Sequence, residues 1–214
     1  MSLKKATLVI AIVLLLDQIV KIYIKTHFVY GSEGMIHVTN WFKILLIENE
    51  GAAWGTRISD IVPISDRSAK LFLTIFRLFA IVGIGYWLYK TILRKGPSIL
   101  IFSISLIFAG ALGNIIDSVF YGLIFDESYG KTATLFAKDP YGTLFHGKVV
   151  DMLYFPMVDT TWPDWVPWLG GESFRFFEPV FNLADTAIST GVGILLVFNK
   201  KAFPPAETTN QPPA

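Results

Sequence analysis

Two aspartates stand in surroundings where a membrane protein seldom tolerates a charge. Asp151 lies in the VVDML stretch at 149–153, and Asp185 begins a segment that is apolar enough to cross a bilayer. A carboxylate in or beside hydrocarbon is costly and by default marks a functional site. Two of them at one depth could share a proton, which is the arrangement that activates water for peptide hydrolysis. The alternative for Asp151 alone is an ordinary loop acid.

Other polar residues recur at helical spacing inside apolar segments. The pairs are Asp17 and Lys21, Asn114 and Asp117, and Asn182 and Asp185. Asp17 and Lys21 share a helix face, with the acidic residue on the N-terminal side, which is the favoured order for an ion pair. We therefore interpret them as an ion pair that orients the helix rather than as catalytic residues. Asn114 could bond a neighbouring helix or touch substrate, and Asp117 could simply cap a helix end. No Lys or Arg lies within one turn of Asp185, so a protonated Asp151 is the partner we expect.

The composition points to a membrane and away from metal or cofactor chemistry. Of 214 residues, 53% are hydrophobic and 16% are charged, whereas a soluble domain carries about 25% charged residues. The chain has no cysteine, which excludes disulfides, iron–sulfur clusters and thiolate zinc sites. His27, His37 and His146 are scattered without metal-ligand spacing. We therefore expect no metal and no cofactor, and the weak net charge of +1 gives no sign of nucleic-acid binding.

The predicted fold is a mainly α membrane domain over residues 1–203. Four transmembrane helices are expected at about 6–24, 70–93, 98–116 and 179–198, each near the ~20 residues that a bilayer requires. A small extracytoplasmic β region is expected over about 27–66, an aromatic-rich periplasmic loop over about 120–178, and a disordered tail over 204–214. On these bounds Asp185 lies six residues past Pro179, roughly 9 Å down its helix.

Basic residues predict the orientation. A group of them flanks the helices on the same side, at Lys4, Lys5, Lys90, Arg94, Lys95, Lys200 and Lys201. Cytoplasmic loops are enriched in Lys and Arg, so both termini should be cytoplasmic and the aspartates should lie near the outer leaflet. The apolar start of the chain lacks a cleavage site of small residues, so it is interpreted as an uncleaved anchor.

A possible substrate-binding strand runs over residues 47–55. It passes from Asn49 into the small residues Gly51 and Ala52, which would let an extended peptide approach closely. A β-bulge or a hairpin turn explains the same residues, so this pattern is weak on its own.

Taken together and in order, these motifs closely resemble the lipoprotein signal peptidases of bacteria, signal peptidase II. They are Asp17-x-x-x-Lys21, NEGAAW at 49–54, GALGNIID at 110–117, VVD at 149–151 and FNLADTAI at 181–188. The resemblance implies an aspartic endopeptidase of the inner membrane that cuts prolipoproteins just before a diacylglyceryl-modified cysteine. It implies that Asp151 and Asp185 are catalytic, that Asn49, Gly51, Ala52, Asn114 and Asn182 bind substrate, and that Asp17, Lys21 and Asp117 support the site. Membrane lipid and globomycin-type peptide inhibitors are the other expected partners, and the chain is expected to act as a monomer.

The chain departs from the family pattern at two places. Ser118 stands where the family usually has arginine, and Arg175 is one residue that could supply the missing cation. The segment 123–147 is much longer than the usual link. It is either a lid over the dyad or a tolerated surface loop, and the loop is slightly favoured.

Two other functional classes compete with a protease. A small proton-coupled transporter could also use intramembrane Asp and Lys residues, but it predicts polar residues spread across the whole depth of the membrane. A noncatalytic assembly factor would keep the helices without needing both aspartates.

Overall fold

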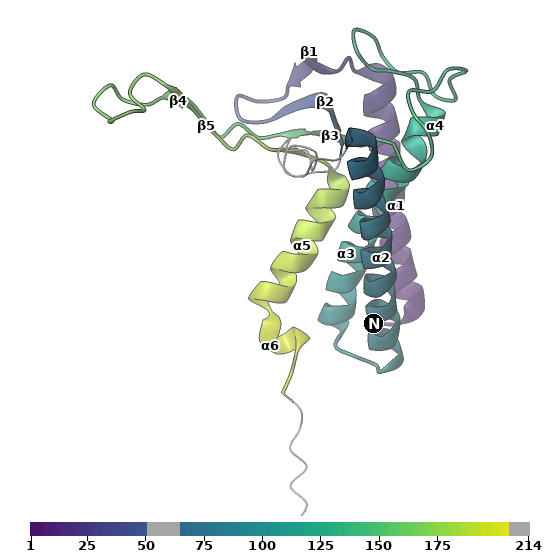
Figure 1. Ribbon diagram of the computed structural model, residues 1–214. Helices are drawn as coiled ribbons and strands as arrows, with labels where there is room; N and C mark the ends of the chain where they lie inside the picture. The colour runs from purple at the N-terminus through teal and green to yellow at the C-terminus, as the bar shows by residue number, and fades with distance from the viewer. Residues whose placement is uncertain (51–64, 206–214) are drawn as a thin grey trace, which may run out of the picture.

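The computed structural model describes residues 1–50 and 65–205, and it consists of a helical bundle that carries a β-sheet at one end (Figure 1). The first two long helices are α1 (Leu3–His27) and α2 (Asp66–Leu93). The third, α3 (Ser98–Ile116), continues through a π-helical turn, η3 (Asp117–Tyr121), into α4 (Gly122–Ile124). The last are α5 (Leu183–Val197) and the short α6 (Asn199–Ala202). A mainly helical membrane fold with a small sheet is thus confirmed.

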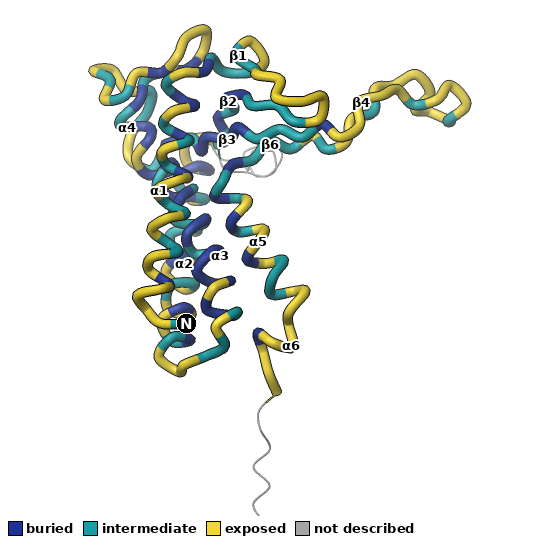
Figure 2. The backbone as a smooth tube through the Cα atoms, turned by 180° about the vertical axis from the view of Figure 1, so that it is seen from behind, coloured by how far each residue is buried: buried dark blue, intermediate teal, exposed yellow. Residues whose placement is uncertain are grey.

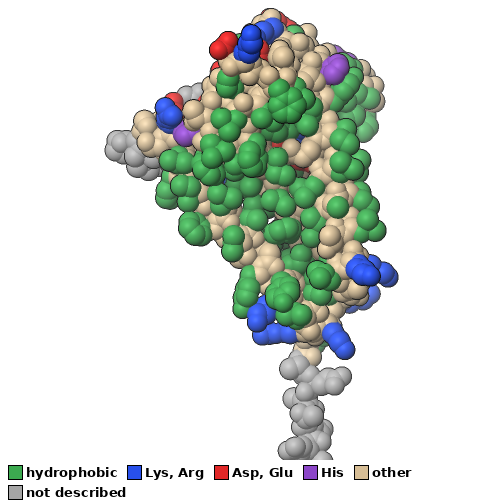
Figure 3. All heavy atoms as spheres, turned by 90° about the vertical axis from the view of Figure 1, so that its right-hand side faces the viewer, with side chains coloured by type: hydrophobic (Ala, Val, Ile, Leu, Met, Phe, Trp, Pro, Cys, Tyr) green, Lys and Arg blue, Asp and Glu red, His purple; other side chains and the backbone are tan. Residues whose placement is uncertain are grey.

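The helical surface is apolar because it faces lipid rather than a protein core. Within the described residues, three helical segments are long and apolar enough to span a bilayer: Leu3–His27, Asp66–Leu93 and Ser98–Ile124. Large side chains such as Leu15, Phe79 and Val82 are exposed on them. Figure 3 shows hydrophobic side chains covering one face of the bundle, with Lys and Arg gathered at the end away from the sheet.

The predicted fourth helix, 179–198, is wrong at its beginning. Val180–Phe181 form the strand β6, and Asn182 caps α5, so the helix begins only at Leu183. With 15 residues, α5 is a shorter apolar helix than the other three. Asp185 consequently lies in the first turn of α5 and not 9 Å along the helix.

The sheet draws on more of the chain than the predicted 27–66 region. Its strands are β1 (Gly31–His37), β2 (Lys43–Asn49), β3 (Val149–Tyr154) and β6, in the order β1-β2-β3-β6, and all pairings are antiparallel. β3 comes from the segment 120–178, which is expected to be loop, and β6 comes from the beginning of the predicted fourth helix. Asn49 pairs with Val149, and Ile47 pairs with Asp151, so a nonlocal register places Asp151 in the sheet.

Helix α3 is the centre of the bundle, and glycines let α5 approach it closely. Figure 2 shows α3 buried along much of its length. A Cβ on Gly110 would collide with the carbonyl of Ala184 and lie 2.7 Å from Ile188 Cγ1. A Cβ on Gly191 would lie 2.7 Å from the carbonyl of Ser103. These glycines therefore set how closely the backbones of α3 and α5 pack.

The segment 123–147 is built into the core at the sheet end of the molecule. Phe125 and Ala133 are buried with Ile24, Leu46 and Met152 in one hydrophobic cluster. The buried Lys25 ammonium donates to Glu48 and, at 3.0 Å, to Ser128 of this segment. Because Phe125 and Tyr141 pack in the cluster that α1 and the sheet also form, the segment is neither a free lid nor a simple surface excursion.

Candidate active site

Asp151 and Asp185 come from different elements and are joined through asparagines. Asp151 on β3 is 3% exposed. Its Oδ1 accepts a hydrogen bond of 2.7 Å from Asn182 Nδ2, and its Oδ2 accepts one of 3.1 Å from Asn49 Nδ2. Each carboxylate oxygen of Asp151 therefore has an amide donor that fixes its direction.

Asp185 is held by the cap of its own helix and by α3. Its backbone N–H donates to Asn182 Oδ1 at 2.9 Å, and its Oδ2 accepts from the Asn182 N–H at 3.3 Å, which is a capping box. Its Oδ1 accepts a 2.8 Å hydrogen bond from Asn114 Nδ2. Asn182 thus caps the helix that carries one aspartate while it donates to the other.

The two carboxyls interact electrostatically. Burial, and then the charge of Asp185, raises the pKa of Asp151 to about 7. The amide donors Asn49 and Asn182 act in the opposite direction, as does the ammonium of Lys21. Like charges that share a buried site resist joint ionisation, so the pair tends to retain one proton near neutral pH.

A second polar layer lies beneath the pair and connects four elements. Lys21 Nζ lies 3.0 Å from Asp17 and 2.8 Å from Asp117, and it donates to Asn114 Oδ1 at 2.9 Å. Asp17 Oδ1 accepts from the Ala184 N–H of α5 at 3.0 Å. Asp117 Oδ2 accepts from the Val150 N–H of β3 at 3.2 Å. This layer fixes α1, α3, β3 and α5 around the two aspartates.

The geometry extends one role expected from the sequence and adds one residue. Asp117 is the C-cap residue of α3, but the chain continues helically through η3, and the Asp117 carboxylate is buried against Lys21. The added residue is Gln18, whose amide donates to Asp17 at 3.1 Å and to Asp117 at 2.9 Å. Gln18 is adjacent to Asp17 in sequence rather than one turn away, so helical spacing gave no signal for it.

The remaining sequence candidates fall outside the site or outside the described residues. Gly51 and Ala52 belong to the undescribed stretch 51–64. Arg175 does not supply a cation to the site, because it lies on the hairpin strand β5 (Ser173–Phe176) and pairs with Asp159 at 3.3 Å. A different cation, Arg77 of α2, interacts electrostatically with both Asp185 and Asp151. Among the residues that the structure describes, no cluster of His, Cys, Asp or Glu could hold a metal ion.

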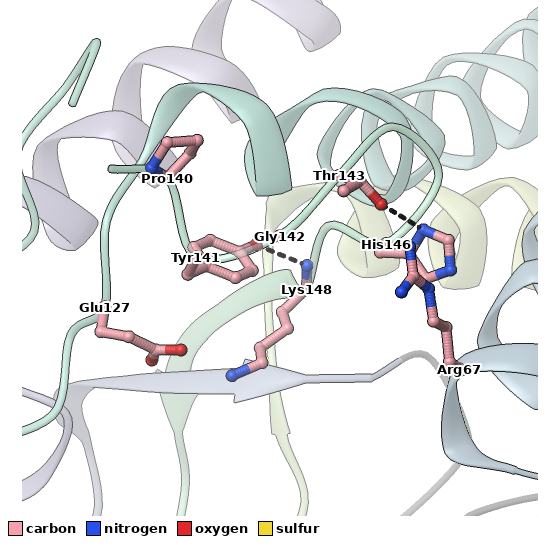
Figure 4. Close-up of a pocket in the computed structure, with 8 residues that line it drawn as sticks. All are labelled: Arg67, Glu127, Pro140, Tyr141, Gly142, Thr143, His146 and Lys148. Atoms are coloured by element: carbon pink, nitrogen blue, oxygen red, sulfur yellow. Dashed lines mark hydrogen bonds between the residues drawn. The ribbon is translucent and has the colours of Figure 1, made fainter. Parts of the chain in front are cut away.

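A separate cavity of about 460 Å³ lies beside the 123–147 segment (Figure 4). It is lined by Arg67, Glu127, Pro140, Tyr141, Gly142, Thr143, His146 and Lys148. The hydroxyl of Tyr141 accepts from the Lys148 N–H at 2.8 Å, and Thr143 Oγ1 lies 3.0 Å from His146 Nδ1. Neither aspartate lines this cavity, so it is distinct from the candidate active site.

Comparison with known proteins identifies the family of the chain. Residues 9–200 match the Peptidase_A8 family, described as signal peptidase (SPase) II. A lipoprotein signal peptidase of Porphyromonas gingivalis is 44% identical over 197 residues, which cover 91% of this chain and 82% of the relative. The lipoprotein signal peptidase of Amoebophilus asiaticus is 36% identical over 192 residues, 87% of this chain and 73% of the relative.

The fold also matches a solved structure. A bacterial membrane enzyme superposes with a TM-score of 0.57 at 22% identity, over 99% of this chain and 96% of the other. At this identity the match supports the fold alone.

Proposed function

The chain belongs to the signal peptidase II family of aspartic peptidases and cleaves the signal peptides of prolipoproteins, and we propose that Asp151 and Asp185 are its catalytic carboxyls. The observation that carries the proposal is the asparagine bridge. Asn182 and Asn114 connect the buried Asp151 of β3 with the half-buried Asp185 of α5. The transporter alternative is not supported, because the described charges near the aspartates gather at the sheet end of the bundle.

The mechanism follows from a pair that holds one proton. Asp151, whose pKa is raised to about 7, carries the proton and donates a hydrogen bond to the scissile carbonyl oxygen. Asp185 takes a proton from a water molecule, and the resulting hydroxide attacks the carbonyl carbon. The tetrahedral intermediate then collapses, the C–N bond breaks, and the leaving amine receives a proton from the pair.

The substrate and its approach are part of the same proposal. The peptide lies extended along Asn49 and the following Gly51 and Ala52, and Asn114 and Asn182 line the cleft. The cut falls just before a diacylglyceryl-modified cysteine, whose acyl chains lie among the apolar helix faces in membrane lipid. Globomycin-type peptides occupy the same place as inhibitors. One chain contains both carboxyls, so a monomer suffices.

The membrane arrangement also belongs to the proposal. α5 has 15 residues and spans about 22 Å, so it crosses as a fourth helix together with α6 and the capping turn. Both termini face the cytoplasm, the sheet lies outside, and the aspartates sit near the outer leaflet of the inner membrane.

Substitution of each aspartate tests the dyad directly. Asp151→Asn and Asp185→Asn should each abolish cleavage of a lipidated prolipoprotein by the purified enzyme, because one carboxyl cannot supply both base and acid. Asp159→Asn is a matched control, since this exposed acid pairs with Arg175 at the surface and its loss should leave turnover unchanged. Near-normal turnover in either dyad variant, with folding intact, would contradict the assignment.

A further inference from the structure

Arg77 brings a positive charge to the dyad from a helix that contributes none of the groups discussed under the proposed function. It lies on α2 in one stripe with Lys70 and Thr74, at spacings of seven and three residues. Residues so spaced share a helix face. Lys70 and Thr74 are buried and Arg77 is half-buried, so this stripe faces the protein rather than lipid.

Two hydrogen bonds show what this face of α2 adjoins. Lys70 Nζ donates to the carbonyl of Glu50 at 2.6 Å, and Glu50 directly follows Asn49, which donates to Asp151. Thr74 Oγ1 donates to the carbonyl of Phe145 at 3.3 Å, close to the start of β3. One turn further along, the Arg77 guanidinium interacts electrostatically with Asp185 and Asp151. The stripe therefore runs alongside the dyad.

Position 118 cannot supply this charge. The Ser118 side chain is fully buried, its hydroxyl donates to the Asn114 carbonyl at 3.0 Å, and its own carbonyl accepts from the Gly147 N–H at 2.9 Å. Among the described residues, Lys21 is already enclosed between Asp17 and Asp117, and Lys70 donates to the Glu50 carbonyl. Arg77 is the remaining described cation that interacts with both carboxyls.

We propose that Arg77 is a positioning residue whose charge keeps one carboxyl of the dyad ionised at neutral pH. Burial and the neighbouring carboxyl favour protonation of Asp151, and loss of the negative charge from the pair would remove the base that activates water. A nearby guanidinium stays charged and counteracts that tendency. The inference rests on the proposed dyad. The charged groups that surround the pair are Arg77 and Lys70 of α2, Lys21 and Asp17 of α1, Asp117 at the end of α3, and Glu50 after β2.

The pH profile of cleavage tests the role of Arg77. Arg77→Gln should move the acidic limb of the kcat/KM profile upward by about one pH unit or more, with a fall of roughly tenfold on that limb. Arg77→Lys keeps a cation and should restore most of the profile. Arg94→Gln removes a charge at the far end of the same helix and should behave like the wild type. Folding of each variant is checked by thermal unfolding in detergent.

Three outcomes separate the possible failures. A folded Arg77→Gln enzyme with the wild-type profile overturns the inference while the dyad stands. If Arg77→Gln does not fold, the activity of Arg77→Lys decides the question. Loss of its activity at every pH would overturn a role of the positive charge, whereas a near-normal pH profile would support that role. Cleavage activity in Asp151→Asn or Asp185→Asn would show that the assignment of the dyad is wrong, and the inference about Arg77 would fail with it.

A second and independent observation concerns the aromatic arm, residues 157–176. It contains the antiparallel strands β4 (Val158–Thr161) and β5, and Trp162 lies against Phe174 with ring centroids 4.8 Å apart. Trp168 is 98% exposed, Trp165 81% and Met157 61%. Figure 1 shows the arm projecting sideways from the sheet, across the direction of the helices and near the beginning of α5.

From this placement we infer that the arm lies in the headgroup region of the bilayer that surrounds the helices. Trp and Phe rings at the boundary between apolar helices and polar outer structure are typical of membrane interfaces. The arm leaves the body where α5 begins, so its apolar side continues the exposed helix surface. Asp159, Asp164 and Glu172 give it the polar side that faces headgroups and water.

The absence of cysteine in the chain allows a clean depth measurement. A spin label is attached to the Trp168→Cys variant in phospholipid liposomes. Its accessibility to oxygen and its accessibility to a water-soluble nickel chelate should each lie between the values of a lipid-exposed and a water-exposed standard. Val82→Cys on α2 gives the lipid standard and Lys131→Cys gives the aqueous one, since both positions are exposed. Accessibility to nickel equal to that at position 131 overturns the inference. Short distances between labels would place a second copy on the arm and overturn it as well.

Discussion

At the scale of residues, asparagine side chains rather than charges organise the site. An amide both donates and accepts, and Asn182 uses both groups by capping α5 and donating to Asp151. Asn114 likewise accepts from Lys21 and donates to Asp185. The dyad geometry is therefore set by neutral groups, and the ion pairs lie one layer further from the reacting atoms.

The buried Asp151 carries a cost to stability that depends on pH. Its pKa is raised from 3.8 to about 7, so between these values the native state holds a proton that the unfolded state has lost. The free energy of unfolding should therefore fall as pH rises from about 4 to about 7, by at most about 1.4 kcal/mol per unit. Asp151→Asn should remove this slope and be the more stable protein at pH 8, as measured by thermal unfolding in detergent. A wild-type slope of the opposite sign would contradict the prediction.

At the scale of elements, apolar length was enough to predict α1, α2 and α3 from the sequence. Residue type and apolar surroundings drew attention to Asp185 and Asp151, but only the family resemblance distinguished Asp151 from an ordinary loop acid. The strand around Asp151 could not be predicted, because its partner β2 lies about a hundred residues away and only the register Ile47–Asp151 reveals it. The late start of α5 depends on the β3–β6 pairing, which is equally nonlocal. Gln18 and Arg77 gain their roles from neighbours on other helices.

The contact between α3 and α5 should be sensitive to a single methyl group. Gly110→Ala would force the helices apart at Ala184, next to Asp185, and should reduce both thermal stability and cleavage, the latter by roughly 10²-fold since displacements near 1 Å cost that much. Gly83→Ala on α2 is the control, because a Cβ there meets nothing within 4 Å. Equal behaviour of the two variants would show that the close approach is not required.

The 123–147 segment should contribute to stability through Phe125. This ring is fully buried and packs edge-on against Tyr121 with centroids 4.9 Å apart. Phe125→Ala should cost about 3–5 kcal/mol of unfolding free energy. Phe136→Ala is the matched control, since that ring is 78% exposed.

Replacement of the whole segment Leu123–His146 by a short Gly-Ser linker should, for the same reason, unfold the protein rather than only weaken substrate binding. If the linker variant is stable and active, the segment is a dispensable surface loop and this prediction is wrong.

At the scale of the whole molecule, the distribution of charge along the bundle axis is asymmetric. No acidic residue occurs between Arg67 and Ile116, whereas the turn between α2 and α3 carries Arg94 and Lys95. The same end holds the beginning of α1 and the helix α6 with Lys200 and Lys201 (Figure 1). The opposite end holds the sheet and the two aspartates. On the proposed assignment of the dyad, the cleavage chemistry is confined to one end of a bundle whose other end is basic.

This asymmetry predicts a topology that can be measured. Lys and Arg remain on the cytoplasmic side during insertion, so reporters fused after Lys95 and after Lys201 should both read as cytoplasmic. A reporter inserted between Asp126 and Asp139 should read as external, on the side where the sheet and the aspartates lie. An odd number of spans would place the two termini on opposite sides, so the fusion after Lys201 tests whether the short α5 crosses. An external signal there, or a cytoplasmic signal from the 126–139 insertion, would overturn the orientation and with it the outer-leaflet position of the dyad.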